Sequence, residues 1–358
     1  MSLEAALAAA IRATAAGAAL DFESWALRVF AHQLAHDPPY RDFCRRRGVT
    51  PATVARWQDV PAVPAAAFKR LELACGAPEA TFRSSGTTQG PDARSRHLVP
   101  HLDLYRASAL TGFARAVLPD GERPHALFLL PPPDVRPDSS LVRMCAFVGE
   151  ALVDGHEWLA DAGGLALDRL TERLAALSAD GRAVLVAGPT AAFARLFATD
   201  RRFRLGPGSR IMDTGGAKGM DRPLSRAGFL RACWSHLGVA GYWCVNEYGM
   251  TELCSQYYDS ALADRLAGRS LDARRLVAPP WLRTRVLDPD TLDEVPAGRP
   301  GILCHHDLAN AGSVSVVLTE DLGHTVGDDG LAVTGRVPGA VPRGCGLLLA
   351  ELAEGAAT

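Results

Sequence analysis

The sequence predicts an α/β protein in two parts, an α/β body over residues 1–280 and a smaller β-rich part with a short tail over residues 281–358. Two observations support this fold class. In the first part, helical patterns alternate with buried apolar runs that end at glycine or proline, and in the second part short β-type runs alternate with turns. At 358 residues and 48% hydrophobic composition, the chain can bury a sizeable core.

The body begins with helices. Residues 3–48 place apolar side chains at helical spacing around Trp25 and Phe30. A stretch punctuated by prolines, residues 61–64, precedes a short helix that contains Phe68. The later elements of the body are strands at 125–130, 183–187 and 209–214 and an amphipathic helix at 165–177. The β-type runs of the second part are 282–287, 301–304 and 313–318.

Charge and cysteine usage exclude several classes of protein. A formal net charge of -2 gives no reason to expect nucleic acid or an anionic membrane as partner. No apolar run reaches the roughly 18 residues of a membrane span, and the alanine-rich start is interrupted by charges, unlike a signal peptide. The eight cysteines form no CxxC pair and no metal-ligand spacing. We therefore expect a reduced, cytoplasmic protein with free thiols.

The first chemical signal is the polar loop over residues 83–90, RSSGTTQG. Closely spaced hydroxyls and two glycines offer the O–H and N–H donors that a polyphosphate needs. The loop is not a P-loop, because the terminal Gly-Lys-Ser/Thr is absent. A solvated surface turn is the alternative interpretation.

The second signal is NEYGMTE, residues 246–252. Tyr248 can stack on a base, Thr251 can meet a phosphate and Glu252 can hold Mg²⁺. Gly249 lets the backbone come close to such a ligand. A helix start capped by polar residues is the alternative.

The third signal is TEDLG at 319–323, followed by TGR at 334–336. A carboxylate on a turn, such as Asp321, is a good partner for ribose hydroxyls. It could equally be an ordinary turn residue.

In this order, the three loops resemble those of the adenylate-forming superfamily, which comprises acyl-CoA synthetases, peptide-synthetase adenylation domains and firefly-type luciferases. SSGTTQG is similar to its phosphate loop, NEYGMTE to its adenine and magnesium motif, and TED with TGR to its ribose and hinge region. Thr214 to Ala217 is similar to the strand end that lies under the adenine. The resemblance implies the fold of the superfamily's N-terminal domain, with helix-flanked sheets.

A closer resemblance is to the acyl-protein synthetase family of the bacterial bioluminescence fatty-acid reductase complex. It rests on LTEDLG, on TGGAKG, on residues 307–310 (DLAN) and on the tail 342–347 (PRGCGL). The chain stops soon after Arg336, so we expect the usual mobile C-terminal domain to be missing. In that family the acid is adenylated and then moved to a cysteine near the C-terminus, which Cys345 matches.

The resemblance implies a site for ATP and Mg²⁺. The nucleotide residues would be Ser84, Ser85, Gly86, Thr87, Thr88, Gly215, Gly216, Tyr248, Gly249 and Asp321, with Glu252 as the metal ligand. Among them, Thr87 and Thr88 would hold the phosphates, Tyr248 would lie against adenine and Asp321 would take the ribose hydroxyls. The catalytic residues would be Lys218, Thr251, Arg336 and Cys345.

The sequence departs from the superfamily pattern at its lysines. The chain has only Lys69 and Lys218, and both the lysine after the phosphate loop and the C-terminal lysine are missing. Arg94 is a candidate substitute for the first, whose role could alternatively be lost, and Lys218 and then Lys69 are candidates for the second. An ordinary surface lysine is the alternative for each.

The remaining cysteines and histidines support weaker hypotheses. Cys345 could instead be a small buried residue of the C-terminal segment. A metal site at Cys304, His305 and His306 is less favoured than a structural role, because adjacent residues of a strand face opposite ways. Trp243, Cys244 and Ala217 are close enough to the motifs to line an acyl pocket.

The sequence therefore predicts ATP-dependent activation of a carboxylic acid, fatty or aryl, to acyl-AMP, followed by acyl transfer to a thiol. The acceptor would be Cys345, coenzyme A, a carrier protein or a partner enzyme's cysteine. One alternative is a compact carboxylate–CoA ligase of the phenylacetate type. A second is an inactive nucleotide-binding subunit of a complex, which the missing lysines leave open.

Overall fold

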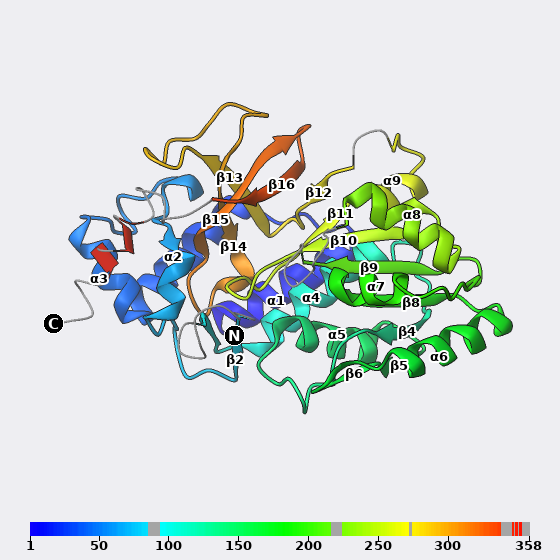
Figure 1. Cartoon of the computed structure of the whole chain (residues 1–358). Helices are drawn as coiled ribbons and strands as arrows, with labels where there is room; N and C mark the ends of the chain where they lie inside the picture. Colours follow the sequence, from blue (N-terminus) through cyan, green and yellow to red (C-terminus); the bar gives the residue numbers. More distant parts are fainter. Residues whose placement is uncertain are drawn as a thin grey trace.

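The computed structural model describes residues 1–84, 94–215, 224–271 and 274–337, together with 346, 348–349 and 351–352. A large sheet runs through the molecule, and helices cover both faces of its parallel half (Figure 1). The predicted α/β class is confirmed. The predicted nucleotide and catalytic residues Ser85, Gly86, Thr87, Thr88, Gly216, Lys218 and Cys345 lie outside the described residues, as does Ala217.

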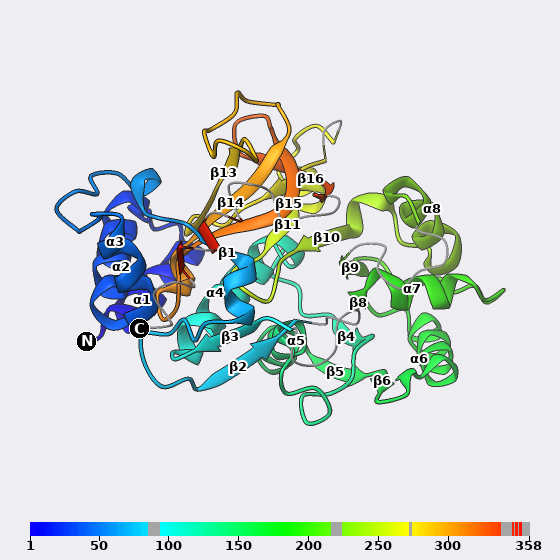
Figure 2. The same ribbon diagram turned by 60° about the vertical axis from the view of Figure 1, so that its left-hand side comes forward.

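The N-terminal segment is helical, as its apolar spacing predicts. Its elements are α1 (Leu3–Ala13), η1 (Thr14–Ala16), α2 (Phe22–His36) and α3 (Pro38–Arg46). Asp37 ends α2 and begins α3, and its Oδ1 accepts a hydrogen bond from the backbone N–H of Tyr40 at 3.0 Å. Pro38 follows at the first helical position, where its missing N–H costs nothing. Helices α2 and α3 lie at the opposite end of the molecule from α6–α8 in both views (Figures 1 and 2).

The parallel half of the sheet has five strands in the order β10-β9-β8-β4-β5. They are β4 (His125–Phe128), β5 (Gly155–Trp158), β8 (Val184–Pro189), β9 (Arg210–Thr214) and β10 (Cys244–Tyr248). One face packs on α1, α4 (Leu102–Val117) and α5 (Ser140–Ala151). The other face packs on α6 (Leu167–Asp180), α7 (Thr190–Phe197) and α8 (Arg226–Leu237). Strands buried on both faces read as continuous apolar runs, which is why the sequence revealed them.

The antiparallel half continues the same sheet beyond β10. Its strands are β11 (Tyr257–Asp259), β12 (Leu276–Val277), β13 (Leu282–Leu287), β14 (Gly301–Asp307), β15 (Val316–Val326) and β16 (Gly330–Arg336). Strand β12 pairs with both β11 and β16, so strands on the two sides of residue 280 belong to one hydrogen-bonded sheet. The division at residue 280 stays a prediction.

Short elements complete the described chain. They are η2 (Trp57–Asp59), β1 (Val63–Pro64), η3 (Ala65–Lys69), β2 (Ala80–Arg83), β3 (Arg96–Val99), β6 (Ala160–Asp161), β7 (Gly164–Leu165), η5 (Gly241–Trp243), α9 (Ala261–Leu266) and η6 (Leu308–Asn310). The longest described helix, α4, has 16 residues, and none in the described part of the chain has the length and apolar composition of a membrane span.

Successive side chains of β10 point alternately into two different cores. Val245 packs in the α4–α5 core and Cys244 in the α6–α8 core. Because successive side chains of a strand point to opposite faces, Glu247 shares the face of Val245, and Tyr248 takes the other. The two residues therefore serve different sides of the site.

Candidate active site

A cavity of about 420 Å³ lies at the carboxyl ends of β4, β8, β9 and β10, beside α4 and α5. Ligands of parallel α/β sheets bind at this edge. The apolar lining comes from Tyr105, Leu130, Pro131, Leu141, Val142, Met144, Pro189, Ala191 and Met250. The polar lining comes from Arg83, Arg136, Ser139, Ser140, Thr190, Thr214, Glu247, Thr251 and Gln256. Gly215 and Gly249 complete the wall.

The two glycines are required for different reasons, Gly215 for its backbone conformation and Gly249 for the space that a Cβ would fill. Gly215 has φ +79°, in the left-handed region that side chains avoid. At Gly249 a Cβ would stand 2.5 Å from Oε1 of Glu247 and 3.4 Å from Cγ of Gln256. Gly249 therefore leaves room for both polar side chains in the cavity wall.

Glu247 is the buried carboxyl of this wall. Its Oε2 accepts a short hydrogen bond from Oγ1 of Thr214, its register partner on β9. Burial raises the pKa of Glu247 to about 7, with the nearby Asp213 adding to the rise and the Thr214 bond opposing it. A carboxyl with this pKa changes its charge near neutral pH.

A second polar cluster lies on the other face of β10 and joins three predicted residues. Oδ2 of Asp321 accepts from the Tyr248 hydroxyl at 2.8 Å, and its Oδ1 accepts from Nε of Arg336 at 2.7 Å. Burial raises the pKa of Tyr248 well above its ordinary value, so the hydroxyl stays protonated and donates. Nε2 of His305 also lies 3.2 Å from this hydroxyl. Figure 2 shows β15 and β16, which carry Asp321 and Arg336, close to β10.

Thr251 and Glu252 follow β10, and side chains from other segments hydrogen-bond to their backbone carbonyls. Nδ1 of His97 donates to the Thr251 carbonyl at 2.8 Å, and Nδ2 of Asn310 donates to the Glu252 carbonyl at 2.7 Å. The Glu252 carboxyl is buried and hydrogen-bonded to Ser95, and burial raises its pKa. The DLAN segment is thus a support for the NEYGMTE motif.

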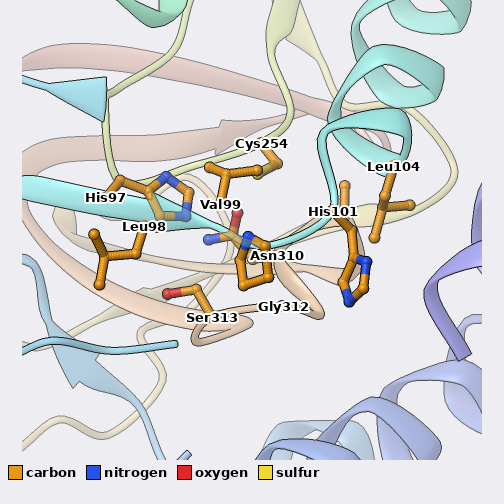
Figure 3. A pocket seen from close by; sticks show the side chains of 11 residues that line it. His97, Leu98, Val99, His101, Leu104, Cys254, Asn310, Gly312 and Ser313 are labelled. Carbon is orange, nitrogen blue, oxygen red and sulfur yellow. The ribbon is translucent and has the colours of Figure 1, made fainter. Parts of the chain in front are cut away.

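A second pocket, of only about 10 Å³, lies beneath this motif (Figure 3). The side chains of His97, Asn310 and Ser313 surround it. A volume near 10 Å³ is about the minimum for one water molecule, so this pocket cannot hold a substrate.

Three arginines contact Asp138, and two of them, Arg83 and Arg136, line the large cavity. Arg136 and Arg94 lie 3.5 and 3.6 Å from its carboxylate oxygens, and the backbone N–H of Arg83 donates to its carbonyl at 2.8 Å. This cluster places positive charge beside the predicted phosphate loop.

Six of the predicted site residues within the described chain fall into two groups. Gly215, Gly249 and Thr251 line the cavity, whereas Tyr248, Asp321 and Arg336 form the cluster on the other face of β10. Ser84 lies at the edge of the predicted phosphate loop, where its Oγ accepts from the backbone N–H of Ser95 at 3.0 Å.

Three other candidates, Lys69, Trp243 and Cys244, lie apart from the cavity. Lys69 is exposed at the end of η3 and does not line the cavity. Trp243 and Cys244 do not line it either, because they stand at the amino end of β10, whereas the cavity is at the carboxyl end. The Trp243 ring packs under the Arg210 guanidinium instead, 4.9 Å from its centroid.

The sequence did not single out Glu247, Gln256, Arg83 or Arg136 as functional. For Glu247 a signal existed, since it shares a strand face with the buried Val245. No local pattern marks Gln256 or Arg136, which reach the cavity from neighbouring segments of the fold.

The cysteines and histidines show neither disulfide pairing nor a metal-binding cluster within the described part of the chain. The seven described cysteines are free thiols. His305 contacts Tyr248 and Tyr257, whereas Cys304 and His306 share the opposite face of β14. No cluster of three or more Cys, His, Asp or Glu residues that could hold a metal occurs among the described residues.

Comparison with solved structures shows the adenylate-forming ligase fold. The open conformation of 2-hydroxyisobutyryl-CoA ligase, in complex with 2-HIB-AMP and CoA, matches with a TM-score of 0.65 and 16% identity, over 88% of this chain and 69% of that one. The same ligase in its thioesterification state matches with a TM-score of 0.65 and 17% identity, over 87% and 67%. The ATP-bound RpMatB-BxBclM chimera B3 matches with a TM-score of 0.50 and 16% identity, over 73% of this chain and 49%, about half, of its own length.

The sequence itself matches one family. No curated protein sequence matches this chain at a significant level. Residues 20–353 match the family described as acyl-protein synthetase, LuxE. Both predicted resemblances are confirmed: the chain belongs to the LuxE acyl-protein synthetase family and is an acyl-adenylate-forming enzyme, which activates a carboxylic acid with ATP and transfers the acyl group to a thiol.

Proposed function

We propose that the 420 Å³ cavity binds the carboxylic acid and that the adjoining motifs bind ATP. The supporting observation is that Gly215, Gly249 and Thr251, from two nucleotide motifs, line the same cavity as the apolar residues of α5. Cavities of this size and lining suit small organic ligands. The acyl chain then lies along α5, with its carboxylate towards Thr251.

The nucleotide lies across the carboxyl end of β10 in this proposal. Asp321 takes the ribose hydroxyls, and the Arg336 and Tyr248 contacts hold its carboxylate in place. Thr87 and Thr88, in the segment beyond Ser84, hold the phosphates. The described residues Arg83 and Arg136 line the cavity next to that segment. Their positive charges offset the negative charge of the phosphates, in place of the missing lysines.

Glu252 is the proposed ligand for Mg²⁺. The fit rests on its carboxyl, which is buried and lies at the end of the NEYGMTE motif. Burial raises the pKa of Glu252, although Ser95 and Arg336 oppose the rise. Mg²⁺ is usually held by one or two protein carboxylates together with substrate phosphates. Bound there, the ion would supply positive charge to the phosphates during displacement.

The chemistry has two displacement steps. A carboxylate oxygen of the acid attacks the α-phosphorus of ATP, and the bond to the β-phosphate breaks with release of pyrophosphate. A thiolate sulfur then attacks the acyl carbon, the carbon–oxygen bond to AMP breaks, and AMP leaves. Lys218 and Arg336 are the proposed cations at the α-phosphate, and Thr251 is the proposed hydrogen-bond donor to it.

Cys345 is the proposed acceptor, between the two glycines of the PRGCGL tail. Transfer to coenzyme A, a carrier protein or a partner enzyme's cysteine is the competing outcome, and the similar 2-hydroxyisobutyryl-CoA ligase was solved with CoA. The free state of the seven described cysteines supports a reducing compartment such as the cytoplasm.

Intact-mass measurement after incubation with Mg·ATP and a panel of carboxylic acids tests this function. We expect a hydroxylamine-labile acyl adduct that disappears in Cys345→Ala. Cys75→Ala, which changes a partly exposed described thiol, is the matched control and should keep the adduct. If AMP forms only when coenzyme A or a carrier protein is added, that molecule and not Cys345 is the acyl acceptor. No ATP–pyrophosphate exchange with any acid would contradict the proposal.

A further inference from the structure

The wall of the large cavity contains a small polar patch formed by Thr214, Glu247 and Gln256. Its two longer side chains are almost completely buried, with exposed fractions of 6% for Glu247 and 7% for Gln256. The wall around them is largely apolar, with Met144, Val142 and Tyr105 among its residues. A polar patch in such surroundings needs a partner.

The structure provides these groups with few partners of their own. The side-chain amide of Gln256 makes no hydrogen bond with any described residue, and Glu247 bonds only through Oε2, to Thr214. Oε1 of Glu247 and Cγ of Gln256 both lie close to the open side of Gly249. Two buried polar side chains thus converge on one place in the cavity wall.

An unsubstituted acyl chain would fit this place poorly. It would cover the Glu247 carboxyl and the Gln256 amide without offering a hydrogen bond, and buried polar groups left in that state lower affinity by roughly tenfold or more. A hydroxyl or an amine offers the donor that both oxygens accept. An amine would also pair with Glu247 in its ionised form.

We propose that Glu247 and Gln256 recognise a hydrogen-bond-donating group, a hydroxyl or an amine, on the acyl moiety of the acid, so that the enzyme prefers a hydroxy- or amino-substituted acid to its unsubstituted parent. This inference rests on the proposed function, because it requires the acid to occupy the cavity. The face of Glu247 agrees with it: this side chain points away from the face of β10 that carries Tyr248, whose hydroxyl donates to Asp321 of β15.

The test measures ATP–pyrophosphate exchange with aliphatic and aryl carboxylic acids, each supplied as the parent, a hydroxy derivative and an amino derivative. For the native protein we expect kcat/KM to be at least about tenfold higher for a substituted acid than for its parent. Comparing kcat/KM for the hydroxy and the amino derivative identifies which donor group the enzyme recognises.

Two variants complete the test. Gln256→Met removes the amide without breaking any hydrogen bond of the described structure, and Glu247→Met removes the carboxyl. Both should bring the substituted-to-parent ratio close to one while the KM for ATP stays unchanged. Glu150→Gln, an exposed carboxylate on the outer surface of α5, is the control and should keep the native ratio.

Three results would overturn the inference: native preference for unsubstituted acids, an unchanged ratio in Gln256→Met, or an effect of the variants on the KM for ATP alone. In each of these cases exchange still occurs and the proposed function stands. Absence of exchange with every acid would instead remove the proposed function and this inference with it.

Discussion

Arg336 and Asp321 face each other across the β15–β16 pair, with Nε of the arginine 2.7 Å from Oδ1 of the carboxylate. Tyr248 donates to the second carboxylate oxygen from β10. Both oxygens of Asp321 are thus oriented by neighbours that come from two different strands. The hydrogen bond from Tyr248 to Asp321 joins the NEYGMTE motif to the TED motif.

Replacing Asp321 by Ala should raise the KM for ATP by about tenfold or more, because hydrogen bonds from ribose to a charged acceptor are each worth about 1.5–3 kcal/mol. Arg336→Ala should weaken ATP binding and also lower the melting temperature, because it takes a charged partner away from the buried Asp321 carboxylate. Pyrophosphate exchange at varied ATP measures the first effect. Arg56→Ala, which breaks the exposed pair with Asp59, is the control. An unchanged KM in Asp321→Ala would exclude the ribose role.

Gly249→Ala should disturb the acid side of the site. Its new Cβ would stand 2.5 Å from Oε1 of Glu247, so the carboxyl must move and its bond with Thr214 must weaken. We expect kcat/KM for the preferred acid to fall about tenfold, while the melting temperature changes by only a few degrees. Gly112→Ala is not a suitable control because it lies in the core. Gly48→Ala, at a positive φ on the surface, controls for backbone strain alone.

Arg83→Ala should lower kcat/KM for pyrophosphate exchange about tenfold to a hundredfold, because a cation paired with phosphate or carboxylate contributes about 1.5–3 kcal/mol. Arg83→Lys should restore the activity only in part, since lysine lacks the planar fork of donors. Arg115→Ala, an exposed arginine of α4 outside the cavity lining, is the control. Full activity of Arg83→Ala would show that the cavity arginines do not replace the missing lysines.

Acid should destabilise the protein through His97. Burial lowers the pKa of this imidazole to about 4, from an ordinary value near 6.5, so between these values the unfolded chain binds a proton that the folded protein does not. Stability therefore falls as pH decreases from 6.5 towards 4, by up to about 3 kcal/mol for this residue.

Urea unfolding of His97→Asn between pH 7 and 4 measures this contribution. Asparagine has no group that titrates in this range, and it keeps an N–H donor for the Thr251 carbonyl. The variant should therefore lose less stability over this range than the native protein. His36→Asn, at the exposed end of α2, should keep the native slope. Equal slopes for His97→Asn and the native protein would contradict a buried, neutral His97.

Local patterns in the sequence were sufficient for much of the secondary structure. The run predicted at 282–287 is β13, and the runs at 183–187 and 209–214 overlap β8 and β9. The end of the 301–304 run was predicted too early, since β14 continues through His305 and His306 to Asp307. Histidine and aspartate look like turn residues, but here they are buried and hydrogen-bonded to partners from distant segments.

The sequence by itself determined the family, the α/β class and the order of the nucleotide motifs, because residue type, spacing and hydrophobic period are local properties that a chain carries before it folds. Only the tertiary structure decided that Glu247 and Gln256 converge beside Gly249, that Arg83 and Arg136 share a cavity, and that one sheet runs past residue 280. These relationships depend on strand pairing and on which face each side chain takes. Both are set by long-range packing, in which a single residue of register would send Glu247 to the opposite face.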